Sequence, residues 1–279
     1  MYQFFLPARL LQPYIQVYWM VQSPQGQPET IRENVFVDGR ADILFNFGCA
    51  YGRRYLTETG IEESLALSNL DGQRHYPVSI AQEGIIDLIG VRFKPGGLAA
   101  FLSLPSYEVS NQTVELKAVF GAAVVELENR LFDSQDATAR IVLLDDFFLR
   151  RLFLPSPYEF ARLVAHSIES SFGLLSMKEL SGQVGYSIRT VDRLFRQCFG
   201  LSPKFYARVV RFQRVLTMLS NDPKIDLTQI TFDCGYYDPS HLTREFSDFT
   251  GQPPSLYRAH LLEKSAAPPP NLVQFLQAP

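Results

Sequence analysis

The sequence is poor in the residues that metal sites and disulfide frameworks require. Its 279 residues include 3 Cys and 4 His. The cysteines Cys49, Cys198 and Cys234 are far apart, and none belongs to a Cys-x-x-Cys pair. We therefore predict three reduced, buried thiols, with no disulfide, no metal and no cofactor.

The short motifs of common enzymes are missing as well. The sequence has no His-x-x-x-His pair, no Gly-x-Ser-x-Gly and no glycine-rich loop followed by Lys-Ser or Lys-Thr. Such motifs supply metal ligands, an activated serine or a phosphate cradle. We therefore predict no catalytic residues and a protein that is not an enzyme.

Long hydrophobic runs are absent too. No stretch approaches the ~20 apolar residues that cross a bilayer. The first residues, Met1 to Pro7, contain neither a basic region nor an apolar run of signal-peptide length. We expect a cytoplasmic protein with no membrane partner.

Excess positive charge is lacking in the chain as a whole, whose net charge is −3. That average argues against a partner with a nucleic-acid or membrane surface. However, residues 155–279 hold 13 basic and 11 acidic side chains, so the first half carries the negative excess. Between residues 186 and 214 the acidic Asp192 stands against a larger basic group: Arg189, Arg193, Arg196, Lys204, Arg208, Arg211 and Arg214. The sequence thus contains a basic patch within an acidic protein.

The first half alternates short apolar segments with turn signals. Residues 14–21, 43–47 and 85–93 are typical of strands, because β-branched and aromatic residues dominate them. Asp38-Gly39 and Asp71-Gly72 are typical of turns. This pattern predicts a sandwich or barrel.

Helical spacing follows over residues 116–132 and 137–154, and Pro155 and Pro157 then mark a boundary. We predict an α+β protein in which residues 1–154 form a β-rich sensor or dimerisation domain closed by helices.

The remainder is helical in pattern. We predict an all-α domain over residues 155–264 and a flexible tail over 265–279, which contains three consecutive prolines.

The helical half contains one pattern twice. Gly185 and Gly235 are 50 residues apart, and a tyrosine follows each. Four further pairs are 51 residues apart: Phe195 and Phe246, Gly200 and Gly251, Pro203 and Pro254, Tyr206 and Tyr257. One inserted residue in the second copy explains the difference, and chance is a poor account of six matched positions.

Each copy is typical of a helix-turn-helix unit, at about residues 176–200 and 227–251. Gly185 and Gly235 suit a tight turn, because glycine adopts positive φ without steric cost. Ser202-Pro203 begins a third helix between the units, so one rigid helix would hold them at a fixed separation. In the first unit an apolar face carries Ile188, Val191, Leu194, Phe195 and Cys198.

These residues resemble the DNA-binding domain of the AraC/XylS family of transcription regulators. The first half of the resemblance runs from Gly185 through Phe195 to Tyr206, and the second from Gly235 through Phe246 to Arg258. It implies a fold of seven helices and two helix-turn-helix motifs. It also implies that the partner is double-stranded promoter DNA, with RNA polymerase, a small-molecule effector and a second copy of the chain as further candidates. On this reading the protein is a sequence-specific regulator, an activator or a repressor.

The resemblance also assigns roles to the outward residues of the two recognition helices. Asp192 could accept from cytosine or orient a neighbouring arginine, and we favour orientation because a carboxylate near phosphates is costly. We expect the first unit to anchor DNA, because residues 215–264 hold four basic and seven acidic side chains. The base-reading candidates are Arg189, Asp192, Arg193, Ser240, His241 and Arg244, and the phosphate candidates are Arg196, Lys204, Arg208 and Arg211.

The first half resembles a less characterised group of such regulators, on the segments 38–45 and 90–97. That resemblance implies a cupin-like sensing or dimerising domain. A ligand pocket and a plain core both fit its apolar residues, and the core is the stronger interpretation. The pocket candidates are Tyr18, Trp19, Phe45, Phe47 and Arg92.

One alternative function comes from another class. The first half could be a cupin-like small-molecule-binding or enzymatic domain, and the helical half could then mediate only protein contacts. Salt-dependent affinity for promoter DNA separates the two hypotheses.

Overall fold

The structure is a computed structural model that describes residues 2–24, 27–56, 60, 62–65, 68–134 and 136–264. The tail predicted for 265–279 lies outside the described residues. No helix in the described ranges is long and apolar enough to cross a membrane.

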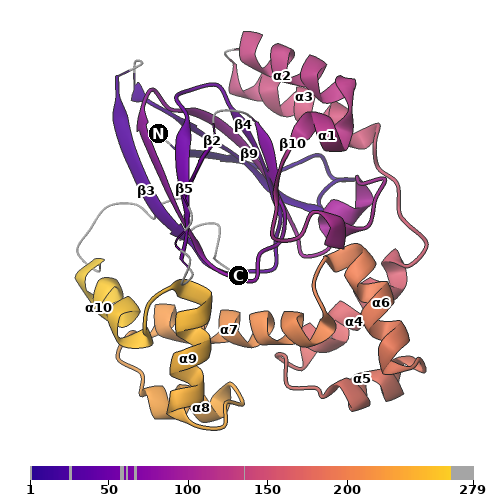
Figure 1. The fold of residues 1–279 in the computed structure, drawn as a ribbon, viewed down its shortest axis with the longest axis vertical. Helices are drawn as coiled ribbons and strands as arrows, with labels where there is room; N and C mark the ends of the chain where they lie inside the picture. Colours follow the sequence, from indigo (N-terminus) through magenta and orange to yellow (C-terminus); the bar gives the residue numbers. More distant parts are fainter. Residues whose placement is uncertain are drawn as a thin grey trace.

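Two antiparallel sheets make up most of the first 115 residues (Figure 1). The six-stranded sheet has the order β1 (Tyr2–Phe5), β2 (Ile15–Gln22), β9 (Asp87–Phe93), β4 (Asp42–Asn46), β7 (Asn69–Asp71) and β10 (Thr113–Glu115). The four-stranded sheet has the order β3 (Glu29–Val35), β8 (Val78–Gly84), β5 (Tyr51–Tyr55) and β6 (Glu62–Leu65). The predicted β-rich fold is confirmed.

The six-stranded sheet is buried on both faces, and strand β2 shows why. Tyr18 and Met20 belong to the core that the sheet shares with the helices, whereas Trp19 lies in a second cluster with Val17 and Val21. Successive side chains on a strand point to opposite faces. The continuous apolar run in β2 therefore supplies both cores.

Three helices cover the outer face of this sheet (Figure 1). They are α1 (Leu116–Phe120), α2 (Ala122–Asp133) and α3 (Ala137–Leu149). The single helix predicted over 116–132 is divided at Gly121, which has a φ of 70° and ends α1. The helix predicted to reach residue 154 ends at Leu149.

Seven helices follow in the described part beyond residue 155, as the resemblance implied. They are α4 (Tyr158–Ser170), α5 (Met177–Val184), α6 (Ile188–Phe199), α7 (Pro203–Asn221), α8 (Leu227–Asp233), α9 (Pro239–Thr250) and α10 (Pro254–Lys264). Each helix-turn-helix unit has its own hydrophobic core, one around Phe195 and one around Phe246. Helix α7 runs between the two units (Figure 1).

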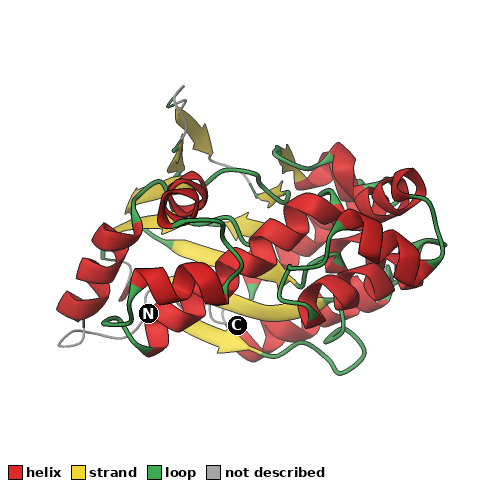
Figure 2. Cartoon of the chain, turned by 90° about the horizontal axis from the view of Figure 1, so that it is seen from below, coloured by secondary structure: helices red, strands yellow, loops and turns green. Residues whose placement is uncertain are grey.

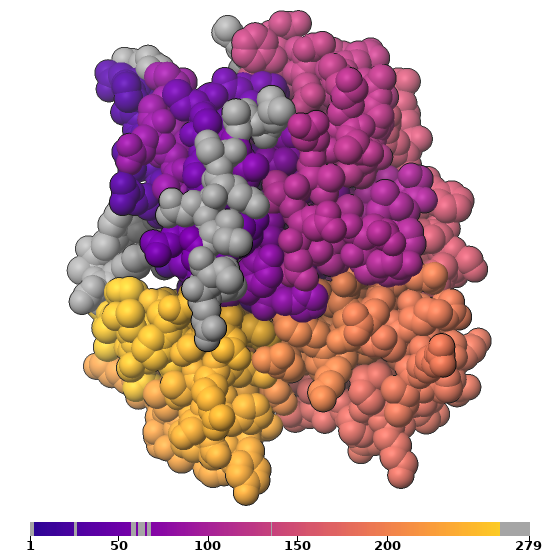
Figure 3. Space-filling view, in the orientation of Figure 1, coloured from indigo at the N-terminus to yellow at the C-terminus, as the bar shows by residue number. Residues whose placement is uncertain are grey.

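We call residues 2–154 the β-rich part and residues 155–264 the helical part. Seen from below, helices cross beneath the strands (Figure 2), and the space-filling view shows the two parts in contact along a broad boundary (Figure 3). Phe36 and Val37 of the β-rich part belong to the core of the second unit, and Ala99 belongs to the core of the first.

The cysteines are unpaired, as expected. Cys198 and Cys234 are buried, but Cys49 is exposed, so the prediction of three buried thiols is wrong for Cys49. Within the described residues, no group of three or more His, Cys, Asp or Glu side chains could hold a metal ion.

Candidate nucleic-acid interface

Both turns have the backbone that the motif requires. Gly185 has a φ of 71° and Gly235 a φ of 69°. Ser181 in the first unit donates from its hydroxyl to the carbonyl oxygen of Tyr186. In the second unit the main-chain N–H of Tyr236 donates to the carbonyl oxygen of Thr231, 2.9 Å away. The small residue four positions before each glycine thus sits at the turn.

Helix α6 presents arginines to solvent. Ser187 caps its start by accepting from the N–H of Thr190 at 3.2 Å. Val191 and Phe195 are buried beneath it, while Arg189 and Arg193 are exposed on the other side. Ile188 is 48% exposed, so the prediction that it joins the apolar face is wrong.

Asp192 contacts an arginine on its own helix. The Nε atom of Arg196 lies 2.7 Å from Asp192 Oδ2, at a spacing of four residues. Both side chains are partly exposed, so the pair adds little stability. The contact matches the orienting role that we favoured for Asp192, and it restricts the rotamers of Arg196.

Helix α9 begins with an aspartate cap. Asp238 accepts from the N–H of His241 at 2.7 Å, and Pro239 occupies the first helical position. Ser240 and Arg244 are exposed, whereas His241 is partly buried with its ring 5.2 Å from that of Tyr236. His241 therefore packs against its own turn as well as facing outward.

The four phosphate candidates differ in their surroundings. Arg196 and Lys204 are exposed. Arg208 lies 2.6 Å and Arg211 lies 3.2 Å from the carboxylate of Glu245, which is only 3% exposed. Arg208 and Arg211 are therefore only partly exposed, and they join α7 to α9.

Glu245 is the main residue that our sequence reasoning missed at this interface. It also accepts from the phenol of Tyr236 at 2.9 Å. Burial, with Glu245 as a neighbour, raises the pKa of Tyr236. A signal for this role was present: Glu245 follows Leu242 by three residues and precedes Phe249 by four, so an acid stands on the apolar face of the helix.

The pocket candidates do not share one cavity in the described structure. Tyr18 and Phe45 are fully buried between the six-stranded sheet and the helices, and Phe47 packs beside them on Phe132. Trp19 lies on the opposite face of the sheet, over Gly90, where a Cβ would come within 1.8 Å of the indole. For the aromatic candidates the plain-core interpretation fits, and the pocket hypothesis stays untested.

Arg92 belongs to a row of charged side chains inside the sandwich. It is paired across the sheet with Asp42, and Asp42 in turn lies opposite Asp71. Arg92 Nη1 lies 2.7 Å from Asp42 Oδ2, and Arg92 also contacts Asp38. Two carboxylates directly opposite each other repel. Burial, with the charge of Asp71, raises the pKa of Asp42 to about 8.

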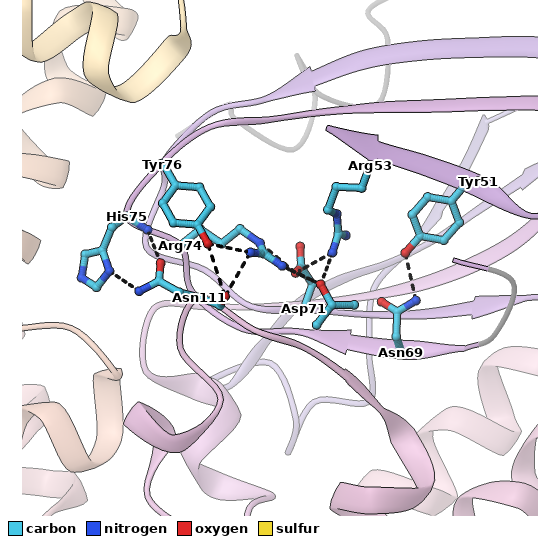
Figure 4. A network of polar contacts seen from close by, with 9 residues as sticks. Tyr51, Arg53, Asn69, Asp71, Arg74, His75, Tyr76 and Asn111 are labelled. Carbon is cyan, nitrogen blue, oxygen red and sulfur yellow. Dashed lines mark hydrogen bonds and ion pairs between the residues drawn. The ribbon is translucent and has the colours of Figure 1, made fainter. Parts of the chain in front are cut away.

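A polar network continues from Asp71 toward the helical part (Figure 4). Asp71 accepts from Arg53 at 3.0 Å and from Arg74 at 2.9 Å. Next to Arg74, the main-chain N–H of His75 donates to the side chain of Asn111 at 2.8 Å. The His75 ring lies 4.3 Å from that of Phe205 on α7, so the network ends on the helical part.

A shallow, solvent-open depression lies at this end of the sandwich. Its lining joins the segment from Val35 to Asp42 with the segment from Asp71 to Val78. Both segments contact the helical part, through Val37 and His75. The two segments that line it therefore also contact the helix-turn-helix part of the chain.

Parts of the chain are similar to known proteins. The family described as "Helix-turn-helix domain" matches residues 180–260. The transcriptional activator RhaR of Salmonella dublin is 29% identical over 159 residues, which cover 56% of this chain and 49% of RhaR. A crystal structure of a probable AraC family regulator from Rhodopseudomonas palustris is 27% identical, covering 36% of this chain and 95% of that one with a TM-score of 0.33. In its helix-turn-helix domain, residues 180–260, the chain is similar to regulators of the AraC/XylS family.

Two further comparisons include the β-rich part of the chain. A family described as "Domain of unknown function (DUF6597)" matches residues 3–115. The structure of ToxT from Vibrio cholerae has a TM-score of 0.46 and 10% identity, covering 84% of this chain and 98% of ToxT. The chain spans about half the length of the curated relatives it matches.

Proposed function

We propose that the protein is a sequence-specific, DNA-binding transcription regulator that places α6 and α9 in successive major-groove windows. One observation carries the proposal. Arg189 and Arg193 project from the first half of α6, and within the described residues neither has an ion-pair partner. Unpaired arginines at the start of a recognition helix are available to base edges.

The base-reading roles follow from this placement. Arg189 and Arg193 bond the O6 and N7 atoms of guanine, and Ser240, His241 and Arg244 make the contacts of the second unit. Asp192 orients Arg196 and does not touch a base.

The phosphate contacts are unequal. Arg196 and Lys204 are exposed and reach the backbone directly, which positions the protein without reading sequence. Arg208 and Arg211 are held by Glu245, so we assign them a smaller share. RhaR is an activator by its name, and we propose activation here too, with RNA polymerase as the partner.

The chain divides into two domains in this proposal. We propose a sensor or dimerisation domain over 1–154 and a DNA-binding domain over 155–264. An effector or a second chain would act through the first domain. We also propose that the protein is not an enzyme and that it works in the cytoplasm.

The salt dependence of the affinity for promoter DNA tests the proposed function. A regulator that makes about six phosphate contacts has a slope of log K against log[salt] near −5. Lys204→Ala should reduce the magnitude of that slope by about one, because it removes one phosphate contact. No salt-sensitive affinity for any promoter fragment, including the one upstream of its own gene, would favour the alternative of a small-molecule-binding protein.

A further inference from the structure

Both recognition helices end on the β-rich part. Helix α6 ends at Gly200, whose carbonyl oxygen accepts from the hydroxyl of Ser110 at 2.9 Å. Helix α9 ends at Gly251, where a Cβ would lie 3.0 Å from Leu56. In the last turn of α9, the carbonyl oxygen of Phe249 accepts from the N–H of Val37 at 3.0 Å.

The fit at the end of α6 leaves no spare room. A Cβ on Gly200 would come within 2.3 Å of Ser110 Oγ and 3.1 Å of the Ser106 carbonyl oxygen. One residue earlier, Phe199 lies against Gly96, where a Cβ would come within 2.6 Å of the ring. A side chain at either glycine would clash, so the end of α6 packs tightly against the β-rich part.

The contacting residues come from loops at one end of the sandwich. Val37 follows β3, Leu56 follows β5, and Ser110 lies between the short helix Ser106–Glu108 and β10. Strands β3 and β5 belong to the four-stranded sheet and β10 to the six-stranded sheet, so both sheets contribute to this end. In Figure 1 this end of the sandwich faces α7 and the two units.

The opposite ends of the recognition helices carry side chains that are exposed in the described structure. Arg189 and Arg193 near the start of α6, and Ser240 and Arg244 near the start of α9, are all exposed. The start of a recognition helix is the end that enters the major groove. The β-rich part can therefore remain attached while both starts face DNA.

The helical part by itself holds the two units together mainly through α7. The two hydrophobic cores are separate clusters, and Phe205 packs at the edge of both. Glu245 fixes α9 to α7, but no equivalent ion pair fixes α6 to α7 among the described residues. The loops of the sandwich supply connections to both units that α7 does not duplicate.

We propose that the β-rich part is a brace that sets the separation and angle of α6 and α9, with Ser110, Val37 and Leu56 as positioning residues. The inference rests on the proposed function. A brace would require a fixed spacing between the two DNA windows that α6 and α9 contact. Each base pair inserted between the windows moves one of them by about 3.4 Å along the duplex and about a tenth of a turn around it. A braced pair of helices cannot follow that movement.

The test uses the full chain and a duplex that it selects from a random-sequence library. Derivatives of that duplex carry one or two base pairs inserted between the two protected windows. The brace variant is Ser110→Ala combined with Leu56→Ala. The matched control combines Ser103→Ala with Leu10→Ala, because both of these side chains are exposed. Circular dichroism checks that each variant keeps its helices, and Ser110→Ala alone is measured beside them.

We expect the unaltered chain and the control to bind the two-base-pair insertion at least about tenfold more weakly than the selected duplex. In the brace variant, the same insertion should reduce affinity by a factor at least about three times smaller. The reduction in Ser110→Ala should lie between those of the unaltered chain and the brace variant. Equal spacing penalties in all four proteins would overturn the brace. Tighter binding of the brace variant at every spacing would also overturn it, because the contacts would then be inhibitory. Failure to select any duplex would instead overturn the proposed function itself.

Discussion

The Nε atom of Arg208 lies 2.6 Å from Oε2 of Glu245, and this pair ties the linker helix α7 to the recognition helix α9. Glu245 is 3% exposed and has two further donors, Arg211 and Tyr236. A buried carboxylate is costly unless charged or polar groups surround it. The three donors meet that requirement, so Arg208 and Arg211 of α7 stabilise the second unit.

Replacing Glu245 by Gln should destabilise the helical part. The change leaves Arg208 and Arg211 without their counter-charge, and we expect a loss of about 2–4 kcal/mol in the free energy of unfolding. Urea denaturation monitored by circular dichroism measures it. Asp248→Asn is the matched control, because Asp248 is an exposed acid on the same helix, and it should stay within about 0.5 kcal/mol. Equal effects of the two changes would show that the Glu245 cluster contributes no net stability.

The local features of the helical part could be predicted from the sequence. Gly185 and Gly235 mark the turns because positive φ is a local requirement that glycine meets in any fold. The caps at Ser187 and Asp238 are local in the same way, since each side chain bonds an N–H three residues on.

Features that depend on distant neighbours could not be predicted. Glu245 meets Arg208 across 37 residues, and no periodicity encodes that pairing. In the sandwich, the facing carboxylates of Asp42 and Asp71 depend on strand register, which the sequence leaves open. The pocket hypothesis placed Tyr18 and Trp19 together, but the two side chains lie on opposite faces of the sheet because they are neighbours on β2.

Arg193→Ala should weaken DNA binding more than Arg244→Ala. Arg193 stands in the basic first unit, and a bidentate guanine contact discriminates bases by about 1–3 kcal/mol. The acidic second unit contributes less, and the Arg244 Nε already approaches the carbonyl oxygen of Ser240 at 3.4 Å. We expect Arg193→Ala to reduce affinity for the selected duplex by about 5- to 150-fold. A gel-shift titration at constant salt measures both variants, and a larger loss from Arg244→Ala would reverse the ranking.

Acidification should loosen the contact between the β-rich and helical parts. Burial lowers the pKa of His75 from its ordinary value of 6.5, the hydrogen bond with Asn111 opposes the shift, and the charges of Arg196 and Arg208 add to it. The folded state therefore binds this proton less readily than the unfolded state. The stability that neutral His75 contributes is present above about pH 6.5 and is lost as the pH falls through the lower pKa of the folded state.

Melting temperatures at pH 7.5 and pH 5.5 test this dependence. His75→Gln should reduce the difference between the two temperatures, because the glutamine does not titrate. His166→Gln is the control, since His166 is exposed on α4. An unchanged difference in the His75 variant would exclude His75 as a source of the pH dependence.

Two glycines three residues apart should respond to alanine in opposite directions. Gly182 lies inside α5 with open space around its Cα, so Gly182→Ala should stabilise the protein by about 0.5–1 kcal/mol through the helix preference of alanine. Gly185 also has open space, but its φ of 71° belongs to the left-handed region. Gly185→Ala should therefore destabilise it by about 1–2 kcal/mol. Because neither Cβ meets another atom, urea denaturation of the two variants isolates the backbone requirement of the turn. Stabilisation by Gly185→Ala would mean that the turn does not need positive φ, and the helix-turn-helix geometry of the first unit would then have to rest on its packing alone.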